Sequence, residues 1–168
     1  MGVLKNLFGK KESVNPYPML KARSLATTAQ DLNLAPTDKM PAVFGMLMEQ
    51  NMGAASVVLL AFAEGSVSLY FSNGGGIIGA GEHATVRKPA LDWIALAQTT
   101  YSIGSPNQKS IGPGEVQFTW RGFAGNVFAS AREEEIQSES HPLYPMYAAG
   151  QNVITEIRKM DEARSRRQ

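Results

Sequence analysis

The stretch AASVVLLAFAEGSVSLYF constrains the fold of this chain more than any other. Its first part, residues 54–63, is an apolar run of strand length, which is typical of a strand buried on both faces. Glu64-Gly65 then forms a two-residue turn. In residues 66–71 apolar residues alternate with serine and tyrosine, which indicates a half-buried strand. The stretch therefore predicts an antiparallel β-hairpin.

A second hairpin is predicted in the C-terminal half of the chain. Residues 115–131, EVQFTWRGFAGNVFASA, begin with Val116, Phe118 and Trp120 in alternation with polar residues. Residues 122–125 supply the turn, and the following residues supply the returning strand. The loop before this hairpin, residues 102–114, is rich in Gly, Pro and Ser.

Three helices are predicted around the hairpins. The first covers residues 40–52, with Asp38 as a candidate cap, and its apolar face follows the i, i+4, i+7, i+8 pattern through Met40, Phe44, Leu47 and Met48. The second lies within residues 82–101, and the third is a long helix that opens at Pro142 or Pro145. Residues 20–34 match neither the helical nor the strand pattern clearly.

Length and composition predict one folded domain. The chain has 168 residues, of which 43% are hydrophobic and 18% are charged, enough to bury a substantial core. We place the α+β domain at residues 20–161. Residues 1–19 form a basic tail with a Pro-containing linker, and residues 162–168 form a basic C-terminal tail.

The charge balance and the absence of cysteine limit the possible partners and chemistry. The formal net charge is +1, so no nucleic-acid partner is expected. Without cysteine there is no disulfide, thiol nucleophile or thiolate metal ligand, which fits a cytoplasmic protein. No apolar run is long enough for a spanning helix. Residues 1–11 have apolar residues at helical spacing beside lysines, which is compatible with weak contact with a membrane surface.

The glycine-rich stretch SNGGGIIGAGEH, residues 72–83, matches the G-x-G-x-x-G pattern of dinucleotide sites. That fingerprint needs a βαβ unit, whereas the strand before these glycines belongs to an antiparallel hairpin, so we do not expect a dinucleotide site. Two interpretations remain: a turn that needs positive φ and close backbone approach, or an anion-binding loop of backbone N–H groups. The residues of the candidate ligand loop are Gly74, Gly75, Gly76, Gly79, Gly81, His83 and Arg87.

Catalytic patterns are not found. The two histidines cannot form a multi-histidine metal site, and neither H-E-x-x-H nor G-x-S-x-G occurs. Glu82 and His83 are adjacent, so on a helix they point about 100° apart and do not form an acid–base pair. We therefore predict no catalytic residue, no metal and no cofactor. Phe118 and Trp120 are interpreted as core residues, with a nucleic-acid stacking face as the alternative.

The predicted order of helix 40–52, the first hairpin, helix 82–101, the second hairpin and the terminal helix resembles the roadblock/dynein-light-chain superfamily, which is related to the longin and profilin-like folds. The resemblance covers roughly residues 38–160. It implies an αββαββα arrangement, an α+β fold in which helices pack on a central antiparallel sheet of two hairpins.

The resemblance also implies a non-enzymatic module that forms homodimers and binds partner proteins. We therefore expect a protein-binding or regulatory homodimer. The alternative is a small-ligand, nucleotide or phosphate-binding protein, or an enzyme, that uses the glycine-rich loop 74–81.

Overall fold

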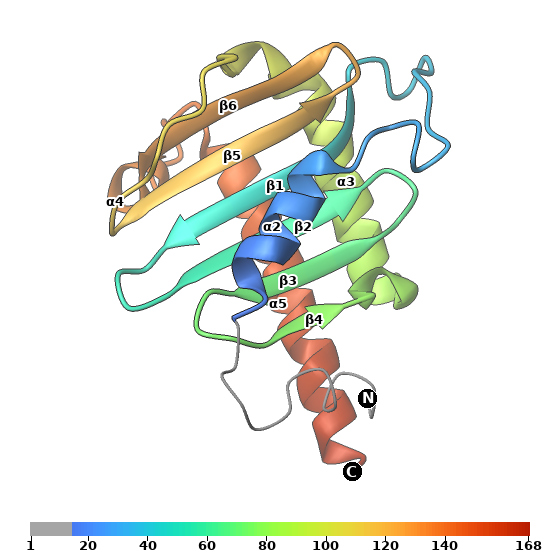
Figure 1. Ribbon diagram of the computed structural model, residues 1–168, viewed down its shortest axis with the longest axis vertical. Helices are drawn as coiled ribbons and strands as arrows, with labels where there is room; N and C mark the ends of the chain where they lie inside the picture. The colour runs from blue at the N-terminus through green and yellow to red at the C-terminus, as the bar shows by residue number, and fades with distance from the viewer. Residues whose placement is uncertain (1–14) are drawn as a thin grey trace.

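The computed structural model describes residues 15–168 and contains one six-stranded antiparallel sheet with the order β4-β3-β2-β1-β5-β6 (Figure 1). This confirms the α+β class and the antiparallel sheet. The strands are β1 (Val43–Asn51), β2 (Ser56–Phe62), β3 (Val67–Phe71), β4 (Gly76–Ile78), β5 (Glu115–Gly122) and β6 (Gly125–Arg132). The helices are α2 (Tyr17–Ala26), α3 (Ala84–Thr100), α4 (Glu133–Ile136) and α5 (Tyr144–Arg166), with short 3-10 turns at Ala80–Glu82 and Tyr101–Ile103.

Both predicted hairpins are confirmed. β2 pairs with β3 and places Leu59 opposite Leu69, while β5 pairs with β6 and places Phe118 opposite Ala129. The glycine-rich stretch adds β4, a short edge strand on β3 that the sequence did not predict. It lies at the opposite edge of the sheet from β6.

The helix predicted for residues 40–52 is wrong, because these residues form β1 in the centre of the sheet. The strand is buried on both faces over Val43–Met48, and these six residues carry no polar side chain. The register with β5 shifts between Val43 and Gly45. As a result Phe44 and Leu47, three residues apart, reach the same side of the sheet, which imitates a helical period. Asp38 caps no helix, and the chain departs from the αββαββα order.

The back face of the sheet is covered by α3 and α5, and it holds the larger core (Figure 1). The indole N–H of Trp93 on α3 donates to the carbonyl of Met146 on α5 at 3.0 Å, which ties the two helices together. Phe118 and Trp120 are fully buried in this core, as predicted, so they do not offer a stacking face to nucleic acid. Pro145 lies in the first turn of α5.

The front face is crossed by α2, which lies over the strands in the centre of the sheet (Figure 1). Residues 17–34 form this helix and a following turn, and of these the sequence left residues 20–34 without a clear assignment. A second apolar cluster lies between them and the sheet. Its buried members are Tyr17, Phe44, Leu47, Val58, Leu60, Phe62 and Tyr70.

The segments expected as tails contribute to the helices. α2 begins at Tyr17, inside the segment expected as a linker, and α5 continues to Arg166. The acidic stretch after β6 contains α4, and Glu133 accepts hydrogen bonds from Gln50 Nε2 at 3.2 Å and from the Tyr147 hydroxyl at 2.7 Å. The predicted membrane contact of residues 1–11 lies outside the described residues.

Candidate functional site

Six of the seven residues of the candidate glycine loop fall into two groups at opposite ends of β4, and the seventh, Gly76, is the first residue of β4. Gly74 and Gly75 form the turn between β3 and β4, both with positive φ. Gly79, Gly81, His83 and Arg87 follow β4 at its other end. A strand of three residues spans roughly 10 Å. The loop therefore does not gather all seven residues around one point.

Two of these glycines are explained by close packing of the backbone. A Cβ atom on Gly76 would lie 2.5 Å from the carbonyl oxygen of Leu69, and one on Gly81 would lie 1.9 Å from the carbonyl oxygen of Gly65. No other residue type avoids these overlaps without a backbone shift. The geometry favours the conformational interpretation at these positions.

His83 and Arg87 face different surroundings. Arg87 Nη2 donates to the carbonyl of Glu64 at 3.1 Å, so this guanidinium binds the β2–β3 turn. His83, the residue before α3, lines a groove of about 610 Å³ in which Arg164 of α5 and Arg167, the residue after α5, also lie. Arg87 does not line that groove. This groove thus joins one residue of the loop to two arginines that the sequence analysis did not connect with it, and Glu82 also lines it.

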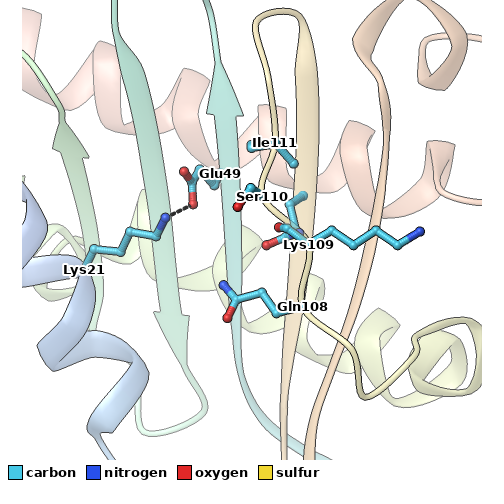
Figure 2. Close-up of a pocket in the computed structure, with 7 residues that line it drawn as sticks. Lys21, Glu49, Gln108, Lys109, Ser110 and Ile111 are labelled. Atoms are coloured by element: carbon cyan, nitrogen blue, oxygen red, sulfur yellow. Dashed lines mark hydrogen bonds and ion pairs between the residues drawn. The ribbon is translucent and has the colours of Figure 1, made fainter.

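A second candidate site lies on the front face beside α2. Lys21 reaches from α2 to the carboxylate of Glu49 on β1 and forms an ion pair with it (Figure 2). The Glu49 side chain is only 12% exposed, so this pair is largely shielded from water. Gln117 on β5 and residues 108–111 complete a groove of about 470 Å³, in which the Lys109 ammonium points away from Glu49 (Figure 2).

Tyr17, the first residue of α2, has a buried hydroxyl group in an unusual environment. The residue is 8% exposed, and its hydroxyl has no hydrogen-bond partner among residues 15–168. Burial, reinforced by the nearby negative charge of Glu49, raises the pKa of Tyr17 well above its ordinary value. The hydroxyl is therefore neutral over the whole physiological range, and its burial without a partner weakens the attachment of α2.

Arg121 on β5 holds the other end of α2. Its guanidinium donates from Nη1 to the carbonyl of Leu25 at 2.5 Å and from Nη2 to the carbonyl of Thr27. It also lies 5.5 Å from the centre of the Phe44 ring. The residue is 4% exposed, and burial lowers the pKa of its guanidinium. A cation placed at the C-terminus of a helix also interacts favourably with the helix dipole.

The outer side of α2 carries little charge. Its exposed residues are Pro18, Met19, Ala22, Arg23 and Ala26, and Met19 is 65% exposed. We call Pro18, Met19, Ala22 and Ala26 the α2 stripe. The outer side of α3, in contrast, carries Arg87, Lys88 and Asp92.

The front-face arrangement is suited to holding a helix. Arg121 binds main-chain carbonyls at a helix C-terminus, and Glu49 binds a basic side chain on the same helix. In the described part of the chain, no group of His, Asp and Glu side chains is placed to hold a metal ion.

The sequence contained only faint signals of this site. Glu49 is the one charged residue within β1. Arg121 comes directly after Trp120 in β5, and its side chain is on the other face of the sheet. Their partners on α2 could not be identified because residues 20–34 had no clear periodicity. Local sequence does not show which helix covers which face of a sheet.

Comparisons with protein-family models, with curated proteins and with solved structures give no match. The resemblance to the roadblock/dynein-light-chain superfamily stays a prediction. Within residues 15–168, no helix combines the length and the apolar character needed to cross a membrane.

Proposed function

We propose that this protein is a non-enzymatic protein-binding module that acts as a homodimer, with contact made through the front of the sheet. The roadblock-like resemblance implies self-association and partner binding, which supports the same proposal. The cytoplasmic location expected from the lack of cysteine belongs to the proposal as well.

The α2 stripe is the observation that carries the proposal. It is an exposed surface with small and apolar side chains, and Met19 is its largest apolar side chain at 65% exposure. Exposed apolar surface is typical of contact sites, and arginine is the charged residue that is enriched at interfaces, so the neighbouring Arg23 fits this use. The polar outer side of α3 lacks this character.

The edges of the sheet support contact through a face. β4 is only three residues long. The middle of β6 is already occupied, because Ser105 and Phe128 exchange main-chain hydrogen bonds of 2.9 and 2.7 Å. Short or covered edge strands prevent pairing between sheets of different molecules. A homodimer therefore has more to gain from the front face than from the edges.

Light scattering coupled to size-exclusion chromatography tests the proposal on the full chain. We expect twice the monomer mass at high concentration, and the monomer mass for the variant Ala22→Glu. The matched control is Ala95→Glu, which puts the same charge on the exposed side of α3 and leaves the dimer intact. A monomer at every concentration, or equal effects of the two variants, would contradict the proposal.

A second candidate function is the binding of a small anionic ligand near the glycine loop. The observation that favours it is the groove in which Arg164 and Arg167 lie beside His83, with Glu82 as its one acidic residue. Grouped cationic side chains bind phosphate groups through charge-assisted hydrogen bonds. The test is a thermal-shift assay with inorganic phosphate and pyrophosphate. This candidate predicts a higher melting temperature that is lost in Arg167→Gln, and it fails if neither anion has an effect.

A further inference from the structure

We infer that the two copies of the homodimer exchange α2 together with the turn that follows it. In the exchanged dimer the front face of each sheet is covered by residues 17–34 of the second copy. The inference rests on the homodimer proposed above and adds a specific partner for the front face. That partner is the α2 segment of an identical chain.

The contacts that hold α2 fit the same segment from a second copy. Arg121 binds the carbonyls of Leu25 and Thr27, and Glu49 binds Lys21. All of these contacts join α2 or the residue after it to strands of the sheet. A second copy carries the same groups in the same order. Exchange therefore keeps every contact, but each contact then joins two chains instead of two parts of one chain.

α2 is held by fewer buried residues than either of the two long helices. It has ten residues, and only Tyr17 and Ser24 are buried, whereas α3 and α5 each bury six. Two polar groups in its attachment site, the Tyr17 hydroxyl and Arg121 Nε, have no partner among residues 15–168. Both features reduce the free energy of holding α2 on its own sheet.

The segment between the exchanged unit and β1 has the properties of a hinge. Leu32 and Leu34 still pack on the front-face cluster, so residues 28–34 move with α2. Residues 35–42 follow, and Thr37 and Met40 close a turn there through two reciprocal main-chain hydrogen bonds of 3.1 Å. Opening this turn lets eight residues extend, and they then span roughly 26 Å.

Two prolines in the hinge favour the extended form. Pro36 and Pro41 fix φ and restrict the residue before each of them to extended conformations. Because the hinge has fewer conformations to lose, extension costs less entropy than it would for a flexible linker. The hinge is exposed apart from the partly exposed Met40 and Ala42, so opening of the Thr37–Met40 turn disrupts little packing. Ala42 itself is held by hydrogen bonds to Gln98 and Phe123 and marks the fixed end of the hinge.

Exchange also explains the α2 stripe. In the exchanged dimer the front faces of the two sheets point toward each other. The two α2 helices then lie between the sheets. The outer side of each α2 then faces the second copy instead of water. Small side chains such as Ala22 and Ala26 permit this close approach.

The absence of cysteine from the chain allows a clean cross-linking test. Lys21→Cys and Glu49→Cys are made in separate chains, the chains are unfolded and refolded together, and a short bismaleimide is added. Exchange predicts a shift to the covalent dimer mass on a denaturing gel for the mixture, and not for either variant alone. The pair Lys88→Cys and Asp92→Cys, which lies on one helix, is the control and cross-links only within a doubly substituted chain.

A second pair keeps the test decisive if loss of the Lys21–Glu49 ion pair impairs folding. Asn15→Cys and Asn73→Cys are both exposed, and the Asn15 side chain donates to the main-chain carbonyl of Ser72, next to Asn73. Covalent dimers from mixed chains support the exchange. If light scattering gives a dimer but cross-links form only within doubly substituted chains, the exchange is wrong and the homodimer proposal is kept. A monomer at every concentration overturns both.

Discussion

Replacement of Arg121 by methionine is the sharpest test of how α2 is held. Methionine keeps much of the volume of the arginine stem but removes both hydrogen bonds to the carbonyls of Leu25 and Thr27. It also removes the cation beside the Phe44 ring. The back-face core does not contain Arg121, so the effect is expected to concentrate in α2.

The size of the effect follows from opposing terms. A hydrogen bond from a charged donor contributes about 1.5–3 kcal/mol, and the contacts with the helix dipole and the aromatic ring add about 0.5–1 kcal/mol each. Burial of the guanidinium costs several kcal/mol and offsets much of this sum. The attractive terms prevail because the guanidinium bonds carbonyls at a helix end. We expect the free energy that holds α2 on the sheet to fall by about 2 kcal/mol. This corresponds to a roughly 30-fold change in the equilibrium between attached and detached α2.

Hydrogen exchange measured by mass spectrometry reads this change directly. Amides of α2 in Arg121→Met should lose roughly 30-fold in protection, while those of the sheet change much less. Arg87→Met is the control, because Arg87 also donates to a main-chain carbonyl but is exposed. Arg121→Lys keeps the charge without the planar fork and should fall between wild type and Arg121→Met. Unchanged protection of α2 in Arg121→Met, or an equal loss in the control, would refute the reasoning.

Three further predictions concern stability. Gly81→Ala should lower the free energy of unfolding by about 3 kcal/mol in denaturant titration, whereas Gly112→Ala, in open space, should change it by less than about 0.5 kcal/mol; equal effects would contradict the packing at Gly81. Tyr17→Phe should raise the free energy of unfolding by about 1 kcal/mol at neutral pH, since it removes a buried hydroxyl without a partner. Because the folded pKa of Tyr17 lies above the unfolded value of 10.0, the wild type should lose stability as pH rises through 10, and this variant should lose less; identical alkaline melting curves would contradict the assignment. Tyr147→Phe should lower the melting temperature through loss of about 1–2 kcal/mol from the hydrogen bond to Glu133, and an unchanged melting temperature would show that this bond contributes nothing.

The sequence predicted β2, which is a single apolar run of strand length, and the elements whose apolar residues lie on one side. β3 and β5 are buried toward the back core on alternate residues, and α3 and α5 have one apolar side, so period and face agree. In β1 the period of the apolar residues does not match one buried face. Phe44 and Leu47 face the front while Met46 and Met48 face the back, because the strand is central and its register shifts near Gly45. The spacing of the apolar residues in β1 therefore mixes residues of both faces, and it does not show the period of a strand with one buried face.

The candidate sites show a similar limit. The glycine pattern of residues 74–81 indicated tight backbone geometry, and the close approaches at Gly76 and Gly81 agree with that interpretation. The front-face contacts join residues far apart in the chain, such as Leu25 with Arg121. Only the arrangement of strands in the sheet brings these residues together, and no local pattern records it.

The central position of β1 has a consequence for synthesis of the chain. One side of β1 pairs with β2, only a short turn away, and the other side pairs with β5. While a ribosome makes the chain, β1 to β4 emerge well before β5 does. During that interval β1 presents a long, apolar, unpaired edge to other nascent chains, which is a site for aggregation. Slow translation between residues 51 and 115 should therefore lower the yield of soluble protein, and a chaperone that covers the β1 edge should restore it.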